Sequence, residues 1–145
     1  MADITFVVNE FSGSREEFLA LTSTFFSDHS ELRGFESIND HISDLLSSDH
    51  DYYQITSDSE VAGLAAVKLE NETIHFDVFV VDPEFREVGV GDELFSTIIS
   101  MPKYVDAKHY ESRALPGDRH TKNFFETRKG KARLLIVRGE ISREH

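Results

Sequence analysis

Three strand-like segments separated by two short polar turns constrain the fold of this chain more than any other feature. YYQIT (52–56), VAGLAAVKL (61–69) and TIHFDVFVV (73–81) are rich in β-branched and aromatic residues or in small apolar ones. The turns between them consist of Ser, Asp, Asn and Glu residues, and turns this short join strands that run in opposite directions. We therefore expect an antiparallel unit of three strands in the middle of the chain.

Segments on either side of this unit predict helices and further strands. SREEFLALTSTFF (14–26) predicts a helix, because Ser14 and Glu17 have capping-box spacing and the apolar residues recur on one helical face. The other predicted elements are a strand at 4–11, helices at 36–47, 91–101 and 119–128, and strands at 107–114 and 132–141. Strands alternate with helices only in the second half, which predicts an α+β fold whose mixed sheet is antiparallel first and then contains a parallel crossover.

The length and composition of the chain favour one globular domain over residues 1–145. A domain of this size buries about 68–70% of its unfolded surface and needs no disulfide or metal for stability. The sequence contains no cysteine, which excludes disulfides, thiolate zinc sites and a cysteine nucleophile. It has neither a secretory signal pattern nor an apolar stretch of membrane-spanning length. We expect a cytoplasmic protein that does not associate with membranes.

The net charge of −12 is concentrated in the first part of the chain. Residues 1–60 contain 13 acidic residues and two arginines, whereas residues 61–145 contain 14 acidic and 13 basic residues. So acidic a surface argues against a nucleic-acid partner, because binding phosphates requires a basic patch. The regional acidity either keeps the protein soluble or attracts a cationic partner, and both interpretations are open at this point.

The histidines that follow aspartates do not indicate a metal site. His29, His41 and His50 lie in different predicted elements and lack the i, i+4 spacing that places two ligands on one helix face. We expect these three side chains to be exposed to solvent and no metal to be bound.

The stretch VVDPEFREVGVGDELF (80–95) leads from a strand into a helix. Pro83 has no amide hydrogen, so strand pairing should end there. The first amides of the helix lack intrahelical partners, and Gly89 and Gly91 would let an anion approach the backbone closely. A tight turn without a ligand accounts for the same residues, so the bend alone does not decide between the two.

This bend resembles the acyl-CoA-binding signature of the GNAT N-acetyltransferase superfamily, in which R-x-x-G-x-G or R-x-x-G-x-A follows a strand that ends in V-x-P. Arg86, Gly89 and Gly91 fall on its defining positions. NFFETRKGKARL (123–134) is similar to the second conserved helix of the family, of the form aromatic-aromatic-E-x-x-G-F. The resemblance covers nearly the whole chain. It implies an acetyl-CoA-dependent N-acetyltransferase with two splayed parallel strands at the centre of a mixed sheet and helices on both faces.

The resemblance also implies where acetyl-CoA, the acyl donor, would bind. Its diphosphate would contact the backbone at the bend, and its pantetheine arm would run between the strands at 73–81 and 107–114. The residues implied in donor binding are Phe79, Val80, Val81, Arg86, Glu87, Val88, Gly89, Val90, Gly91, Asp92, Asn123 and Phe125. Residues 119–133 contain six basic residues and one acidic residue, and could also hold CoA phosphates.

Catalysis needs a group that removes a proton from the amine, because an alkylamine with a pKa of about 10.4 is protonated at pH 7. The strand TIHFDVFVV offers His75 and Asp77, which by period-2 alternation share one face with Phe79 and Val81. Family members place a base at positions that match His75 and Asp77. A buried His75–Asp77 pair with a purely structural role remains an alternative.

A proton donor for the leaving thiolate is less evident. Phe125 stands where many family members have a tyrosine with this role. Tyr110 and Ser112 on the next strand could supply a hydroxyl instead, or could simply pack in the core. A thiol with a pKa of about 8.5 leaves tolerably as the thiolate, so the reaction does not require the tyrosine.

Further departures from the family pattern make the donor site less cationic. Glu87, Val88 and Asp92 replace residues that are usually small, polar, basic or uncharged, and Lys129-Gly130 stands where the family has Gly-Phe. Together with Phe125 they leave two alternatives to an enzyme open. These are a non-catalytic acyl-CoA-binding sensor and an acidic protein-interaction module on the same fold.

The acidic first part of the chain predicts the kind of acceptor. In the resembled family the first two helices and their loop form one wall of the acceptor entrance, which corresponds here to residues 14–47. That stretch contains seven acidic residues and two arginines. We therefore expect a cationic small-molecule or peptide amine as the acceptor. The sequence leaves open whether the protein forms a homodimer.

Overall fold

The computed structural model describes residues 5–25, 46, 49–85, 88–112 and 124–125. Its elements are β1 (Phe6–Glu10), α1 (Arg15–Phe25), β2 (Asp51–Ser57), β3 (Glu60–Glu70), β4 (Thr73–Val81), a 3-10 turn (Pro83–Phe85), α3 (Val90–Ile99) and β5 (His109–Ser112). Each of these helices and strands coincides with a segment predicted from the sequence. The helix predicted at 36–47, the strand predicted at 132–141 and most of the helix predicted at 119–128 lie outside the described residues.

The five strands form one mixed sheet in the order β1-β2-β3-β4-β5. Strands β1 to β4 pair in antiparallel fashion, and β5 pairs with β4 in parallel. Asp58 and Ser59 turn the chain from β2 into β3, and Asn71 and Glu72 turn it from β3 into β4. All four residues have positive φ, as two-residue hairpin turns require. The predicted α+β fold with a mixed sheet is therefore confirmed.

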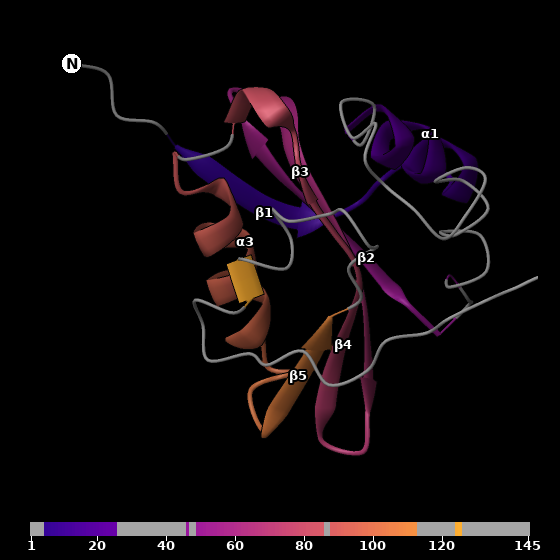
Figure 1. The fold of residues 1–145 in the computed structure, drawn as a ribbon, viewed down its shortest axis with the longest axis vertical. Coiled ribbons are helices and arrows are strands. Elements are labelled where there is room, and N and C mark those ends of the chain that lie inside the picture. The colour runs from indigo at the N-terminus through magenta and orange to yellow at the C-terminus, as the bar shows by residue number, and fades with distance from the viewer. Residues whose placement is uncertain (1–4, 26–45, 47–48, 86–87, 113–123, 126–145) are drawn as a thin grey trace, which may run out of the picture.

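Helices α1 and α3 pack on opposite faces of this sheet (Figure 1). On one face, α1 buries Phe18 and Phe25 in a cluster with Val80. On the other face, α3 buries Leu94 and Ile98 in a second, larger cluster. The prediction of helices on both faces is confirmed, and β4 is almost entirely buried between them.

Both described helices are short, with 11 residues in α1 and 10 in α3. Helix α1 begins at the predicted capping residue, where the Oγ atom of Ser14 accepts a hydrogen bond from the amide of Glu17 (3.1 Å). In the part of the chain that the structure describes, no helix has the length and hydrophobicity needed to cross a membrane.

A β-bulge interrupts the pairing of β3 with β4. Ala66 pairs with Val78 and Val67 pairs with Phe76, so Asp77 is the extra residue of the bulge. The alternation of side chains changes phase at this point. Phe76 lies in the α3-side cluster and so does Phe79, whereas Val78 lies in the α1-side cluster.

The bulge changes the face on which the residues after Asp77 lie, so the predicted alternation is wrong for the second half of β4. Regular alternation placed Phe79 and Val81 on the same face as His75 and Asp77. Both Phe79 and Val81 instead belong to the α3-side cluster, because the extra residue at the bulge rotates the rest of β4 by one position.

Candidate active site

The predicted bend between β4 and α3 has the expected backbone path. β4 ends at Val81, two residues before Pro83, and the amide of Asp82 still donates to the carbonyl oxygen of Ala62 (2.8 Å). Gly89 then adopts a left-handed conformation, with φ +90°, directly before α3. Among the described residues, no side chain caps the start of α3, so its first backbone amides can serve as donors to an anion.

The two glycines of the bend are required for different reasons. A Cβ atom on Gly89 would have none of the described residues within 4 Å, so among them only the positive φ favours glycine. A Cβ atom on Gly91 would lie 2.8 Å from Cε2 of Phe124, so Gly91 makes room for an aromatic ring. Of the other residues implied in donor binding at this bend, Val88 is exposed and Asp92 lies in the first turn of α3. Arg86 and Glu87 lie outside the described residues.

Within the described residues, the pairing of β4 with β5 covers only part of β4. Thr73 to Phe76 pair with His109 to Ser112. From Val78 to Val81, the ladder partners of β4 within the described ranges all lie on β3. This is the segment that contains Phe79, Val80 and Val81, the three strand residues implied in donor binding.

Six aromatic residues pack together between β4, β5 and α3: Phe76, Phe79, Phe95, Tyr110, Phe124 and Phe125. Phe124 stacks closest to β4, with its ring centroid 4.9 Å from that of Phe79. The hydroxyl of Tyr110 donates to the backbone carbonyl of Phe125 (3.1 Å), and burial raises the pKa of this phenol. Asn123, also implied in donor binding, lies outside the described residues.

The hydroxyl oxygen of Ser112 is buried in the same region. Ser112 pairs with Phe76, the last β4 residue that pairs with β5. Its Oγ atom has no hydrogen-bond partner among the residues that the structure describes. An orphaned buried hydroxyl is unusual, because leaving one unsatisfied costs about 1–3 kcal/mol.

His75 lies beside exposed carboxylates. Its Nδ1 atom is 3.4 Å from Glu111 on β5, and its Nε2 atom is 3.8 Å from Glu70 on β3. The His75 side chain is 18% exposed, and the two glutamates are more than half exposed. Ion pairs of this kind contribute little to stability.

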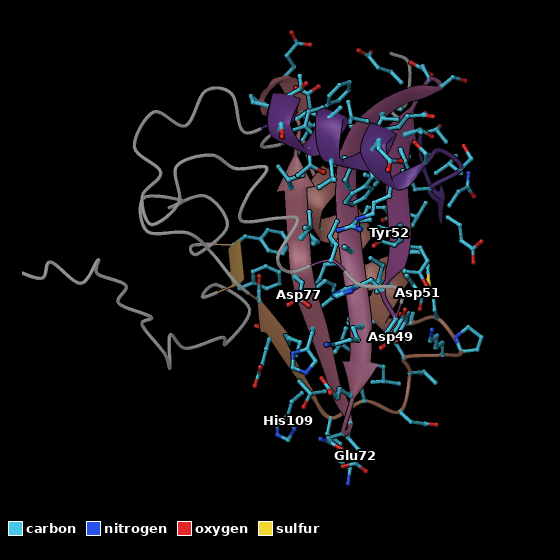
Figure 2. The ribbon with its side chains drawn as sticks, turned by 90° about the vertical axis from the view of Figure 1, so that its right-hand side faces the viewer. Asp49, Asp51, Tyr52, Glu72, Asp77 and His109 are labelled. Carbon is cyan, nitrogen blue, oxygen red and sulfur yellow. The ribbon has the colours of Figure 1, made fainter. Side chains whose placement is uncertain are left out.

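Asp77 is buried and forms a hydrogen bond with His50. The Nε2 atom of His50 lies 2.7 Å from Oδ2 of Asp77, and the two side chains are 1% and 7% exposed. In Figure 2, α1 crosses the strands at the top of the view, Glu72 and His109 lie at the bottom, and Asp77 lies between them. The buried carboxylate is therefore on the sheet itself, beside the bulge and away from the hairpin end.

The prediction that His50 is exposed is wrong. His50 directly precedes β2, and its ring points to the α1 side of the sheet, 6.5 Å from the ring of Tyr52. One local signal indicated burial. His50 and Tyr52 are two residues apart, so strand alternation places their side chains on the same face of the sheet. His29 and His41 lie outside the described residues. The residues that the structure describes include no group of three or more His, Cys, Asp or Glu side chains that could hold a metal ion.

The fold and the sequence agree on one family. The sequence profile of the acetyltransferase (GNAT) family matches residues 16–130. The chain belongs to this acetyltransferase family. No curated protein sequence matches the chain significantly.

Solved structures of GNAT acetyltransferases share the fold. A putative acetyltransferase from Pyrococcus furiosus has a TM-score of 0.67 at 20% identity, with 94% of this chain and 100% of that one covered. An aminoglycoside N-acetyltransferase in complex with CoA has a TM-score of 0.64 at 14% identity, with 97% and 98% covered. A ribosomal-protein alanine N-acetyltransferase from Escherichia coli has a TM-score of 0.60 at 11% identity, with 85% and 76% covered.

A second polar network in this GNAT domain ties β2 to the segment after α3. Asp51 accepts hydrogen bonds from Lys103 and from the hydroxyl of Tyr104 (2.5 Å), and the hydroxyls of Tyr104 and Tyr53 lie 3.1 Å apart. Partial burial opposes ionisation of Asp51, but the hydrogen bonds from Lys103 and Tyr104 outweigh it and lower its pKa. Burial and the hydrogen bond to Asp51 raise the pKa of Tyr104 far above its usual value. The network is thus an anchored carboxylate with two neutral phenols.

Proposed function

We propose that the protein transfers the acetyl group of acetyl-CoA to the amine of a cationic acceptor. The observation that carries this proposal is the position of Asp77, a buried carboxylate at the bulge of β4. It lies at the start of the segment, Asp77 to Val81, that would line the pantetheine arm. A carboxylate held there could take the proton that an alkylamine must lose before it attacks.

Acetyl-CoA is the proposed acyl donor because the start of α3 suits a diphosphate. No described residue lies within 4 Å of a Cβ atom placed on the left-handed Gly89, and the positive end of the α3 dipole lies directly behind it. Family membership and the CoA complex of the similar aminoglycoside N-acetyltransferase support this choice. Arg86, Glu87 and Asn123 remain proposed contacts.

The proposed reaction is a direct transfer. The amine nitrogen attacks the thioester carbonyl carbon, the C–N bond forms, the C–S bond breaks, and CoA leaves as the thiolate. Backbone amides near Val80 and Val81 are the proposed donors to the carbonyl oxygen as it gains negative charge. The amine proton goes to Asp77 or His75.

Of these two residues, we favour Asp77 as the base. It lies at the bulge and is buried, so a proton transfer there is shielded from water. His75 lies two residues earlier in the part of β4 that still pairs with β5, between the exposed carboxylates of Glu70 and Glu111. His75 remains the second proposed base.

Two hydroxyls are proposed as proton donors to the thiolate in place of the missing tyrosine. The raised pKa of Tyr110 keeps its phenol protonated, but its hydrogen already binds the carbonyl of Phe125. Ser112 has a buried oxygen for which the described part of the chain offers no hydrogen-bond partner. Ser112 could therefore act without breaking an existing hydrogen bond.

The acidic first part of the chain supports a cationic acceptor. On α1, Glu16 and Glu17 are exposed, whereas the other five acidic residues of 14–47 lie outside the described residues. Several similar structures are aminoglycoside acetyltransferases, one of them in complex with sisomicin. Amino-sugars, polyamines and basic peptide termini are therefore the first acceptors to test.

A panel of such amines, assayed with acetyl-CoA by release of the CoA thiol, tests this function. We expect turnover with cationic amines and little with neutral or anionic ones. Stabilisation by acetyl-CoA without turnover of any amine would instead support the acyl-CoA-binding sensor, and neither effect would support the interaction module.

A further inference from the structure

We propose that His50 is a positioning residue that holds the carboxylate of Asp77 for proton transfer. The inference rests on the proposed function, since it assigns His50 a part in the same reaction. The observation behind it is the buried hydrogen bond of 2.7 Å between Nε2 of His50 and Oδ2 of Asp77. His50 directly precedes β2, a strand that is not adjacent to β4.

The position of Asp77 explains why its carboxylate needs a partner. Asp77 is the extra residue of the bulge, at the point where the register between β4 and β3 shifts. Its side chain is almost fully buried, and a buried carboxylate is strongly destabilising unless it is hydrogen-bonded. The imidazole N–H of His50 supplies such a hydrogen bond from a side chain that is itself 1% exposed.

The sheet is built so that these two side chains can meet. β3 lies between β2 and β4, and strands two apart are separated by roughly 10 Å. Ala66 is the β3 residue that pairs with both Tyr52 and Val78, and its small side chain leaves space on the α1 side of the sheet. The long imidazole and the short carboxylate can therefore span β3 and form their bond above it.

A positioned base differs from a merely structural pair in its effect on the reaction. If His50 acts through Asp77, its loss should lower kcat and leave the affinity for acetyl-CoA unchanged. The loss should also disappear once the Asp77 carboxylate is gone, because residues that act as a unit give non-additive effects. A purely structural pair would lower stability without this dependence.

The experiment compares four full-length proteins at saturating acetyl-CoA, using the best amine of the panel and release of the CoA thiol. They are the wild type, His50→Leu, Asp77→Asn and the double variant. We expect Asp77→Asn to lower kcat about 100-fold or more, His50→Leu to lower it about 10-fold or more, and the double variant to match Asp77→Asn. The exposed His109, at the far end of the sheet (Figure 2), gives the matched control His109→Leu, with kcat within about twofold of wild type.

A second pair of variants covers the case in which His50→Leu does not fold. The side-chain amide of Gln reaches the position of Nε2, whereas that of Asn reaches only the position of Nδ1. We expect His50→Gln to keep kcat within about threefold of wild type and His50→Asn to lower it about tenfold or more, as His50→Leu does, because only Gln can donate to Asp77.

Three results would overturn the inference: a folded His50→Leu with wild-type kcat, losses that multiply in the double variant, or equal kcat for the Gln and Asn variants. A wild-type protein without turnover on any amine would overturn the proposed function, and the inference with it. If the wild type is active and the His50 variants have the same kcat, the inference is overturned and the proposed function is not.

Discussion

The ring of Phe124 lies directly against the backbone of Gly91, 2.8 Å from the place where a Cβ atom would be. This contact joins the two sequence motifs on which the family resemblance rests, the glycine bend and the second conserved helix. We predict that Gly91→Ala lowers the free energy of unfolding by about 1–3 kcal/mol, because the added methyl group must displace an aromatic ring. Chemical denaturation measures this difference.

The matched substitution Gly89→Ala should act through the backbone alone. Its Cβ atom meets nothing, but alanine at φ +90° is strained by about 1–2 kcal/mol. Because the loss at Gly91 depends on Phe124, the variant Phe124→Ala should remove most of the effect of Gly91→Ala and none of the effect of Gly89→Ala. Equal behaviour of the two glycines in the Phe124→Ala background would contradict this assignment.

Binding of acetyl-CoA should depend on the open side of the bend. At 100 times its dissociation constant, a ligand that binds only the native state adds about 2.7 kcal/mol of stability. We predict a clear increase in Tm with acetyl-CoA for the wild type, and most of that increase lost in Gly89→Val, whose side chain would occupy the open space beside α3. An increase that is unchanged in Gly89→Val would place the diphosphate elsewhere.

The Asp51 network predicts a pH dependence of stability. Asp51 has a lower pKa in the folded protein than its usual value of 3.8, so its charge stabilises the fold above that pH, and the contribution is lost as the pH falls through the folded value. At pH 7, Asp51→Asn should lower the free energy of unfolding by about 1 kcal/mol, a modest amount because Lys103 is largely exposed. The difference between wild type and variant should shrink as the pH falls below about 4. A difference that stays constant down to pH 2 would show that the charge of Asp51 does not matter.

The proposed attraction of a cationic acceptor predicts a dependence on salt. Screening over about 8 Å at physiological ionic strength should raise KM for the acceptor as NaCl is added, with little change in kcat. Replacing Glu31 and Glu36 with Gln and Asp40 with Asn should raise KM at low salt in the same way. Glu72→Gln, at the hairpin end of the sheet (Figure 2), is the control and should leave KM unchanged. If the acceptor kinetics are independent of salt, the acidity serves solubility only.

The two candidate proton donors can be separated by single substitutions. Ser112→Ala should lower kcat by about tenfold or more if the orphaned hydroxyl protonates the thiolate, and it should not lower stability, since no hydrogen bond is lost. Tyr110→Phe should lower stability by about 1 kcal/mol through loss of the bond to Phe125. Wild-type kcat in both variants would mean that the thiolate leaves without their help.

Local sequence patterns predicted the strands, the described helices and the turns, because the causes of these elements are local. Asp58-Ser59 and Asn71-Glu72 are turn residues wherever they occur between two strands, and Ser14 with Glu17 starts a helix by itself. The bulge at Asp77 could not be predicted in this way. It arises from the register in which β4 pairs with β3, and no residue of TIHFDVFVV marks the position at which the alternation changes.

The partner of Asp77 escaped prediction for a related reason. His50 is 27 residues away in the chain, and no local sequence pattern joins the two residues. Its burial depends on the spacing between β2 and β4, which β3 separates, and on the small side chain of Ala66. Both are properties of the assembled sheet. The bend at Gly89 and Gly91 was predictable, but the separate reasons for the two glycines appear only when Phe124 is in place.

The most direct test of the account is the rate of CoA thiol release by wild type and by Asp77→Asn, at saturating acetyl-CoA and with a cationic alkylamine as acceptor. Removing the charge of the buried carboxylate removes the proposed proton acceptor, and acetyl-CoA binding at the distant start of α3 should be unaffected. We predict a kcat for Asp77→Asn that is about 100-fold or more below that of wild type, with the same increase in Tm on adding acetyl-CoA. Equal kcat for the two proteins would contradict the assignment of Asp77 as the base.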